Sequence, residues 1–286
     1  MNIPIDSQKN KVEKGRLYLV ATPIGNMADI TLRALKTLEE CDFVAAEDTR
    51  NTGKLLAYYD IHRPLFAYHE HNKRTAGEKI AERLLAGESC ALVTDAGMPG
   101  ISDPGFDLVC LCREKGIGYT VVPGPCAAVT ALVLSGMAEK EFAFVGFLSG
   151  SDREKKEKLE ALSSEKRPLI LYEAPHRLTD TLTLMRESFA ERKIAFCREL
   201  TKINEEVAQM TLEEALSFYQ EREPRGEYVL IVEGAPDEAC FWAEMDVPSH
   251  VAFYQQQGMS KMDAMKAAAR DRGCSKNEIY KQMIDG

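Results

Sequence analysis

The feature that most constrains the fold of this 286-residue chain is a repeated alternation of short apolar runs, polar turns and amphipathic stretches. Three apolar runs, at 17–20, 43–46 and 90–93, each end at a polar or glycine-containing cluster. This alternation predicts buried strands joined by helices, as in an α/β protein. Open sheets of that kind bind ligands beyond the carboxyl ends of their strands, so we expect the three clusters to share one cleft.

The pattern continues into a second half with its own strands. A strand at 119–122 stops at a Pro-Gly-Pro turn and is followed by a helix over 127–134. We therefore expect a first α/β lobe over 15–138 and a second over 139–236, with its last strand antiparallel and an interlobe pocket between the polar strand ends. The strands expected in the second lobe are 142–147, 169–172, 194–197 and 228–233.

The two ends of the chain differ from these lobes. Residues 1–14 are polar and predict a flexible tail. Residues 237–286 lack a strand pattern, and helical stretches at 261–270 and 277–284 predict a small helix-turn-helix-like domain. From Ser249 onward six Lys or Arg face four Asp or Glu, which is compatible with weak RNA docking or with a solvated helical face.

Charge and composition exclude several classes of protein. The formal net charge of −9 argues against a protein that coats nucleic acid through a large basic surface. The eight cysteines lack CxxC spacing, so neither a zinc site nor a disulfide framework is expected. There is no Walker A loop or dinucleotide fingerprint. No apolar run is long enough for a bilayer, and we expect a cytoplasmic protein with no membrane segment.

The loop at 95–105 is the richest candidate site, with three glycines, two prolines and two aspartates. Such a loop shapes the backbone and offers carboxylates to the amine or hydroxyl groups of a ligand. Asp103 has a second interpretation, as the cap of a helix that begins with Pro104. His69 and His71 lack a nearby third metal ligand, which leaves a substrate-contacting loop or a surface turn.

Seven motifs follow one another along nearly the whole chain from Gly15. They are TPIGN at 22–26, AAEDTR at 45–50, DAGMPGISDPG at 95–105, PGPCAAVTAL at 123–132, YEAPHRL at 172–178, RELTK at 198–202 and GEYVLIVEG at 226–234. Together they resemble the tetrapyrrole-methylase superfamily. AAEDTR, YEAPHRL and RELTK resemble the branch that methylates ribosomal RNA of the small subunit.

The resemblance implies a homodimer of two-lobed α/β subunits with a small C-terminal helical domain, S-adenosylmethionine held between the lobes, and no metal. It implies 2′-O-methylation of a cytidine ribose in 16S ribosomal RNA within the small subunit. Met98 and Cys126 stand where many members have Thr and Ser. The residues that match cofactor-binding positions are Asp95, Gly97, Met98, Ile101, Ser102, Cys126, Ala127, Tyr172, Leu200 and Glu227.

A ribose hydroxyl is weakly acidic, so transfer to it should benefit from a nearby base. The candidates at strand ends are Glu47, Asp48, Glu199 and Lys202, and the lysine would need a depressed pKa. Three arginines are suited to clamping RNA phosphate, although each could equally pair with a nearby carboxylate. They are Arg50, Arg177 and Arg198.

Two alternatives stay open. The nearer is a methyltransferase of the same fold that acts on a tetrapyrrole or a protein. The other is a non-enzymatic nucleic-acid-binding regulator that uses the C-terminal helices and binds DNA in a salt-sensitive way.

Overall fold

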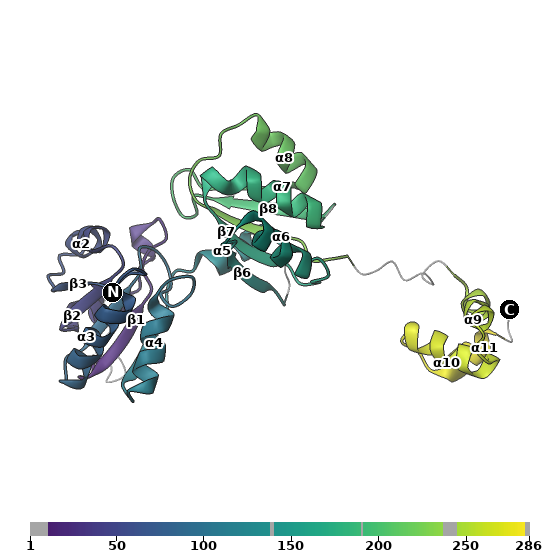
Figure 1. Ribbon diagram of the computed structural model, residues 1–286, viewed down its shortest axis with the longest axis horizontal. Coiled ribbons are helices and arrows are strands. Elements are labelled where there is room, and N and C mark those ends of the chain that lie inside the picture. The colour runs from purple at the N-terminus through teal and green to yellow at the C-terminus, as the bar shows by residue number, and fades with distance from the viewer. Residues whose placement is uncertain (1–10, 138–139, 190, 237–244, 284–286) are drawn as a thin grey trace, which may run out of the picture. The chain divides into compact units, whose positions relative to one another are not determined.

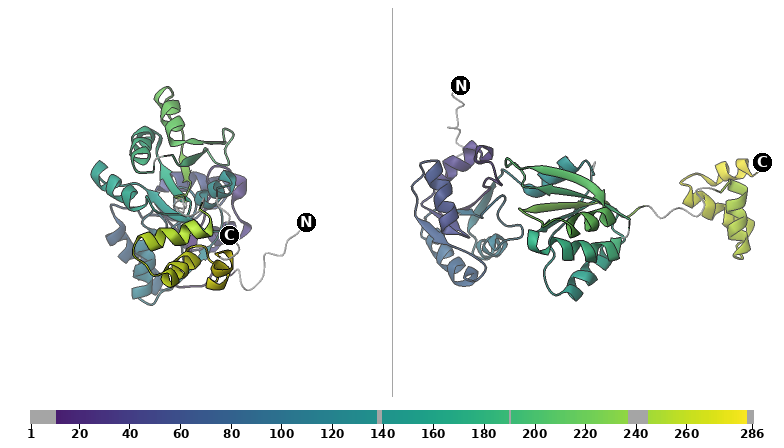
Figure 2. Two further views of the ribbon diagram at one scale, coloured as in Figure 1. Left: turned by 90° about the vertical axis from the view of Figure 1, so that its right-hand side faces the viewer. Right: turned by 90° about the horizontal axis from the view of Figure 1, so that it is seen from above.

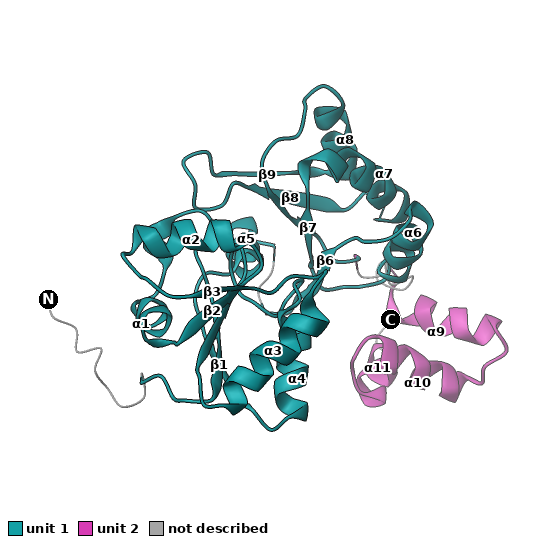
Figure 3. Cartoon of the chain, turned by 60° about the vertical axis from the view of Figure 1, so that its left-hand side comes forward, with its two compact units in different colours: residues 1–235 teal, residues 236–286 magenta. Residues whose placement is uncertain are grey.

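The computed structural model describes residues 11–137, 140–189, 191–236 and 245–283 (Figure 1). Most of the predicted N-terminal tail, part of the expected lobe boundary and Ile284 lie outside these residues. The chain divides into two compact units, residues 1–235 and 236–286 (Figure 3). The first unit contains two five-stranded sheets, each of which we treat as the centre of one lobe.

The first sheet is parallel throughout, with strand order β3-β2-β4-β1-β5. The three apolar runs of the sequence form its central strands and are buried along almost their whole length, which confirms them as strands. The three-residue β3 was not predicted, because it is too short to show a pattern. The strands are β1 Arg16–Val20, β2 Phe43–Ala46, β3 Leu65–Ala67, β4 Cys90–Val93 and β5 Gly118–Val122.

Helices cover both faces of this sheet (Figures 1 and 2). One face packs against α1 (Leu32–Glu40) and α2 (Thr49–Tyr58), and the other against α3 (Lys73–Leu85) and α4 (Gly105–Glu114). Thr31 caps the start of α1, since its hydroxyl accepts from the Ala34 amide at 3.1 Å. The helices on both faces exclude water from the strands, as a parallel sheet requires.

The second sheet is mixed, with strand order β6-β7-β10-β8-β9. The last strand, β10, is antiparallel to both neighbours, as predicted. The edge strand β9 was not predicted, because its apolar residues are separated by polar ones and none of its residues is fully buried. The strands are β6 Ala143–Phe147, β7 Leu169–Glu173, β8 Lys193–Arg198, β9 Glu206–Thr211 and β10 Tyr228–Val232.

The helix at Ala127–Ser135 (α5) packs on this second sheet, although it precedes the expected lobe boundary in the chain. Its Ala128, Ala131 and Leu132 cover one face of β7, β8 and β10. Small side chains on α5 allow this close approach to the strands. The opposite face of the sheet is covered by α6 (Asp152–Ala161), α7 (Leu178–Phe189) and α8 (Leu212–Gln220).

In the second unit, the described residues form α9 (Val247–Gln256), α10 (Lys261–Asp271) and α11 (Lys276–Gln282) around a small apolar core. The two predicted helices are present. The third, α9, was not predicted, and it has Asp246 as its N-cap and Pro248 in its first turn. Proline is tolerated there because the first turn needs no amide donor. Within the described part of the chain, no helix has the length and apolarity to cross a bilayer.

The buried face of β10 generates a stability prediction. Leu230 is fully buried among the side chains of α6–α8, so Leu230→Ala should lower the free energy of unfolding of this lobe by about 2–5 kcal/mol. Ile203→Ala, at a fully exposed residue of the same lobe, should leave it nearly unchanged. Urea denaturation followed by circular dichroism measures both, and equal effects would contradict this packing.

Candidate cofactor and active site

The loops that follow β1, β2 and β4 lie at one edge of the first sheet, because these strands are parallel neighbours. The loops after β1 and β4 pair through their backbones, with Thr22 N to Gly97 O at 2.9 Å and Gly97 N to Thr22 O at 3.1 Å. The Asn51 side-chain Nδ2 donates to the Asp95 carboxylate at 3.4 Å and joins α2 to the same edge. The three polar clusters therefore lie side by side at this edge, and the shared cleft expected among them stays a prediction.

Asp103 shapes the glycine-rich loop from within. Its carboxylate accepts from the amides of Gly100 at 2.9 Å, Ile101 at 3.2 Å and Gly105 at 2.7 Å. The last bond reaches Gly105, the first residue of α4, so Asp103 does bind an amide of the helix start, but the helix begins one residue later than expected and Pro104 occupies its N-cap. Burial raises the pKa of Asp103, although the three amides act to lower it. Neighbouring Ser102 is left in the left-handed region at φ 67°.

Four of the residues that match cofactor positions lie in one apolar cluster of the second lobe. Leu200 is buried in it, and Cys126, Ala127 and Tyr172 are partly buried against it. Burial raises the pKa of the Tyr172 hydroxyl to about 12, so this side chain is neutral and can donate a hydrogen bond. The structure thus brings these four residues together, from α5, β7 and the loop after β8.

The remaining matched residues lie on the 95–102 loop and on the segment before β10. Asp95 and Ser102 are exposed, Gly97 is buried, Met98 is half-buried and Ile101 is 52% exposed. A side chain at Gly146 on β6 would come within 3.0 Å of the Ser102 hydroxyl, so the first-lobe loop reaches the second sheet there.

Gly25 marks a second close approach between the lobes. A side chain at this position would lie 2.6 Å from Lys202 Cγ and 2.7 Å from the Leu200 carbonyl oxygen. The TPIGN motif does not reveal this need for space, because it depends on the loop of Leu200 and Lys202, which is far away in the sequence. The approaching loop is itself strained, since Glu199 and Thr201 have φ of 51° and 65°.

A charged network holds that loop. The Lys202 ammonium donates to the Glu199 and Glu227 carboxylates, both at 3.0 Å, and the Glu227 amide donates to Glu199 at 3.1 Å. Burial acts to lower the pKa of Lys202, but its two carboxylate partners raise it overall. The depressed pKa that a lysine base requires is therefore absent. Burial acts to raise the pKa of Glu199, and the bonds from Lys202 and the Glu227 amide leave it lowered.

Adjacent Glu47 and Asp48 follow β2 and differ in their surroundings. Asp48 caps α2 through the Arg50 amide at 2.8 Å and binds the Arg50 guanidinium, which lowers its pKa to about 2. Burial raises the pKa of Glu47, and the charges of Asp95 and Asp103 raise it further. Glu47 therefore has the pKa closer to neutrality, which favours it as a base over Asp48.

Each of the three candidate RNA-binding arginines is paired with a carboxylate. Arg50 binds Asp48 with two nitrogens, at 3.1 and 2.8 Å. Arg177 donates to buried Glu173 at 2.9 Å, and Arg198 to exposed Glu206 at 2.7 Å. The pairing alternative is thus realised, with sequence neighbours as partners for Arg50 and Arg177, and with a residue of the paired strand β9 for Arg198.

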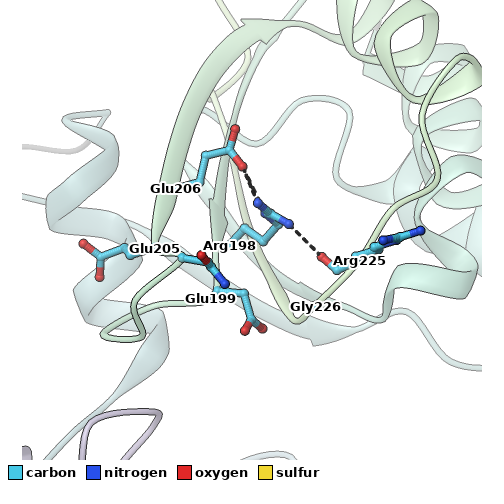
Figure 4. Close-up of a pocket in the computed structure, with 7 residues that line it drawn as sticks. Arg198, Glu199, Glu205, Glu206, Arg225 and Gly226 are labelled. Atoms are coloured by element: carbon cyan, nitrogen blue, oxygen red, sulfur yellow. Dashed lines mark hydrogen bonds and ion pairs between the residues drawn. The ribbon is translucent and has the colours of Figure 1, made fainter.

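A cavity of about 480 Å³ opens beside Arg198 (Figure 4). All of its lining residues come from the second lobe, so it is distinct from the expected interlobe pocket. The lining residues are Arg198, Glu199, Asn204, Glu205, Glu206, Arg225 and Gly226.

His69 and His71 lie in the loop between β3 and α3. Their ring centroids are 6.0 Å apart in an edge-to-face arrangement, and the His69 amide donates to the Asn72 side chain at 2.8 Å. Among the residues that the structure describes, no group of three or more His, Cys, Asp or Glu side chains is placed to hold a metal ion.

Comparison with known proteins agrees with this fold. The family described as Tetrapyrrole (Corrin/Porphyrin) Methylases matches residues 16–216. Uroporphyrin-III-C-methyltransferase from Thermus thermophilus superimposes with a TM-score of 0.57 at 22% identity, over 77% of this chain and 94% of that chain. This structural likeness shows a shared fold and confirms the expected two-lobed α/β class.

Sequence relatives are nearer. The chain is 46% identical over 278 residues to the ribosomal RNA small subunit methyltransferase I of Halalkalibacterium halodurans, covering 96% of each chain. It is 46% identical over 280 residues to the protein of that name in Bacillus subtilis, again covering 96% of each. The chain therefore belongs to the tetrapyrrole methylase family, in the branch of the ribosomal RNA small subunit methyltransferases I.

Proposed function

We propose that this protein transfers a methyl group from S-adenosylmethionine to the 2′-hydroxyl of a cytidine ribose in 16S ribosomal RNA of the small subunit. The observation that carries the proposal is the 46% identity over nearly the whole length to proteins named for methylation of that RNA. The convergence of the matched motifs at the strand ends supports it.

The residues at those strand ends fit S-adenosylmethionine. Exposed Asp95 offers carboxylate oxygens to hydroxyl or amino groups, and exposed Ile101 offers apolar surface on the same loop. The apolar cluster of Cys126, Ala127 and Leu200, with the Tyr172 ring, suits a flat base. When bound, the cofactor supplies an electrophilic methyl on a sulfonium, and the chain then has only to place and activate the acceptor oxygen.

Glu47 is the proposed proton acceptor. Its pKa is raised by burial and by the Asp95 and Asp103 charges, which brings its basicity closer to the working pH. Asp48 is instead committed to Arg50 and to the start of α2. Glu199 and Lys202 are committed to each other and to Glu227, so we assign them to positioning the second-lobe loop.

RNA binding is assigned to arginines of the strand ends. Arg50 is almost fully exposed, so RNA phosphate can exchange with its partner Asp48. Arg198 is partly exposed beside a cavity lined by glutamates, which suits contact with an RNA base better than with a phosphate. The net charge of −9 favours binding at a local site, because acidic residues outnumber basic ones and do not supply a large basic surface. No step of the proposed reaction requires a metal.

We further propose a homodimer in the cytoplasm. Val129, Val133 and Leu134 on α5 and Phe142 and Phe144 at the β6 edge are exposed large apolar side chains. Exposed apolar surface of this kind is typical of association sites.

The direct test is transfer of labelled methyl from S-adenosylmethionine to small ribosomal subunits from cells that lack this protein. Label should appear in RNA as an alkali-resistant dinucleotide, because a 2′-O-methyl group blocks alkaline cleavage. Label confined to a base would rule out ribose methylation. Label absent from RNA but present in an added tetrapyrrole or a protein would support the alternative substrates.

Glu47→Gln tests the proposed base. It should lower kcat by about 10²- to 10⁴-fold and leave S-adenosylmethionine affinity unchanged. In the wild type, kcat should fall as pH drops through the raised pKa of Glu47, at higher pH than for an ordinary glutamate. Because an ionised Glu47 opposes folding above that pKa, the Gln variant should unfold at the same or a higher temperature. Unaltered kcat in this variant would contradict the assignment.

Lys202→Met tests whether the lysine acts as a fixed cation. Its raised pKa keeps it protonated, so the wild-type pH–rate profile should show no rise due to Lys202 between about pH 7 and 9. The variant should lose about tenfold or more in kcat/KM through misplacement of the 199–202 loop, and Lys202→Arg should recover part of it. A rise with pH that disappears in Lys202→Met would instead identify a lysine base.

A further inference from the structure

Two adjoining cavities open on the far face of the second sheet from the proposed cofactor cluster. Along β8, Ala195 and Cys197 face α5 and that cluster, while Phe196 faces α6–α8. Arg198 continues the alternation and points to the same face as Phe196. A second cavity of about 140 Å³, lined by Phe218 and Arg222, shares Arg198, Glu206 and Arg225 with the cavity of Figure 4.

The larger cavity combines donors and acceptors. Arg198 donates to Glu206 at 2.7 Å and to the Arg225 carbonyl oxygen at 3.4 Å, as the dashed lines in Figure 4 show. Three carboxylates, of Glu199, Glu205 and Glu206, line it together with two arginines. A bare phosphate would face this excess of negative charge. A neutral planar group with both donors and acceptors matches the mixed lining better.

The smaller cavity adds stacking surfaces and cations. The Arg222 guanidinium lies over the Phe218 ring at 4.5 Å, and both arginines of the 222–225 segment are exposed. Arg225 points away from Arg198 in Figure 4 and pairs with Glu223 at 3.0 Å, in an ion pair that is open to solvent. Unstacked bases pack on aromatic rings and guanidinium planes, and neighbouring phosphates bind exposed arginines.

We propose that these cavities bind one unstacked nucleotide of single-stranded RNA that flanks the methylated ribose, an inference that rests on the proposed function. The base enters the larger cavity, where Arg198 donates to a ring or carbonyl acceptor and a glutamate accepts from an exocyclic amine. The phosphates lie along Arg222 and Arg225. Cytosine has both an exocyclic amine and adjacent acceptors, whereas uracil lacks the amine, so the site selects cytosine over uracil.

Glu199 links this site to the proposed active site. Its carboxylate lies at the edge of the cavity, and the same carboxylate accepts from Lys202 and from the Glu227 amide. Gly226 allows this arrangement, because a side chain there would come within 2.7 Å of the Glu199 carboxylate. A bound nucleotide would therefore contact the residue that holds the 199–202 loop in its strained conformation.

Fluorescence anisotropy with labelled ten-residue oligocytidylate and oligouridylate tests the proposal on the full chain. Arg222→Ala/Arg225→Ala should weaken oligocytidylate binding about tenfold or more and reduce the salt dependence by about one phosphate contact or more. The wild type should bind oligocytidylate more tightly than oligouridylate. The matched control is Arg153→Ala, an arginine on α6 that is 87% exposed and paired with Glu157. It should bind both as the wild type does.

Unchanged oligocytidylate affinity in the double variant would overturn the docking site. Equal wild-type affinity for the two oligonucleotides would overturn the proposed selection of cytosine over uracil. Methyl transfer to small subunits separates this from the function itself. Wild-type transfer to RNA together with unaltered binding by the double variant refutes the docking site alone. A wild type that binds these oligonucleotides as expected but labels no RNA refutes the proposed function alone.

Discussion

The site depends on the parallel orientation of β1, β2 and β4. Because these strands run side by side in one direction, the loops after them emerge at the same edge, with amides and carbonyls that the sheet does not use. The Thr22–Gly97 pairing and the Asp103 carboxylate satisfy part of these groups and fix the loops. Helices on both faces keep the strands dry, so the polar edge is where a ligand can reach them.

The second lobe contributes through contact with those loops. Gly25 allows the loop at 199–202 to approach, and a larger residue would separate the two at Leu200. Two non-glycine residues of that loop adopt left-handed backbone conformations, which are costly unless other contacts impose them. The Lys202 bonds to Glu199 and Glu227 supply such contacts. The same charges explain why Lys202 is a poor base despite its place at a strand end.

Much of this was predictable from the sequence where burial leaves a pattern. Central strands such as 43–46 and 90–93 are apolar throughout because they are covered on both faces, and their bounds match the prediction. Edge strand β9 is half-exposed and polar, so its residues carry no comparable signal. The packing of α5 on the second sheet was not predictable from chain order, because it is decided by which surface its small residues fit.

The candidate site shows the same division. The clusters after each strand were predicted to meet because topology alone places them together. The partners of the three arginines were not predicted. Asp48 and Glu173 are sequence neighbours of Arg50 and Arg177, where more than one carboxylate was available, whereas Glu206 meets Arg198 only through the pairing of β8 with β9. Position 25 requires glycine because the loop at 199–202 lies against it, and this contact joins segments far apart in the sequence. The cavity beside Arg198 also forms between separate segments, 198–206 and 225–226.

The central claim is that the strand-end loops of both lobes form one cofactor site. A crystal structure of the full chain with S-adenosylhomocysteine, the product form of the cofactor, tests it most directly. We predict electron density for the ligand between the 95–102 loop and the cluster of Cys126, Tyr172 and Leu200. Density in the cavity beside Arg198 instead, or anywhere away from these loops, would contradict the account.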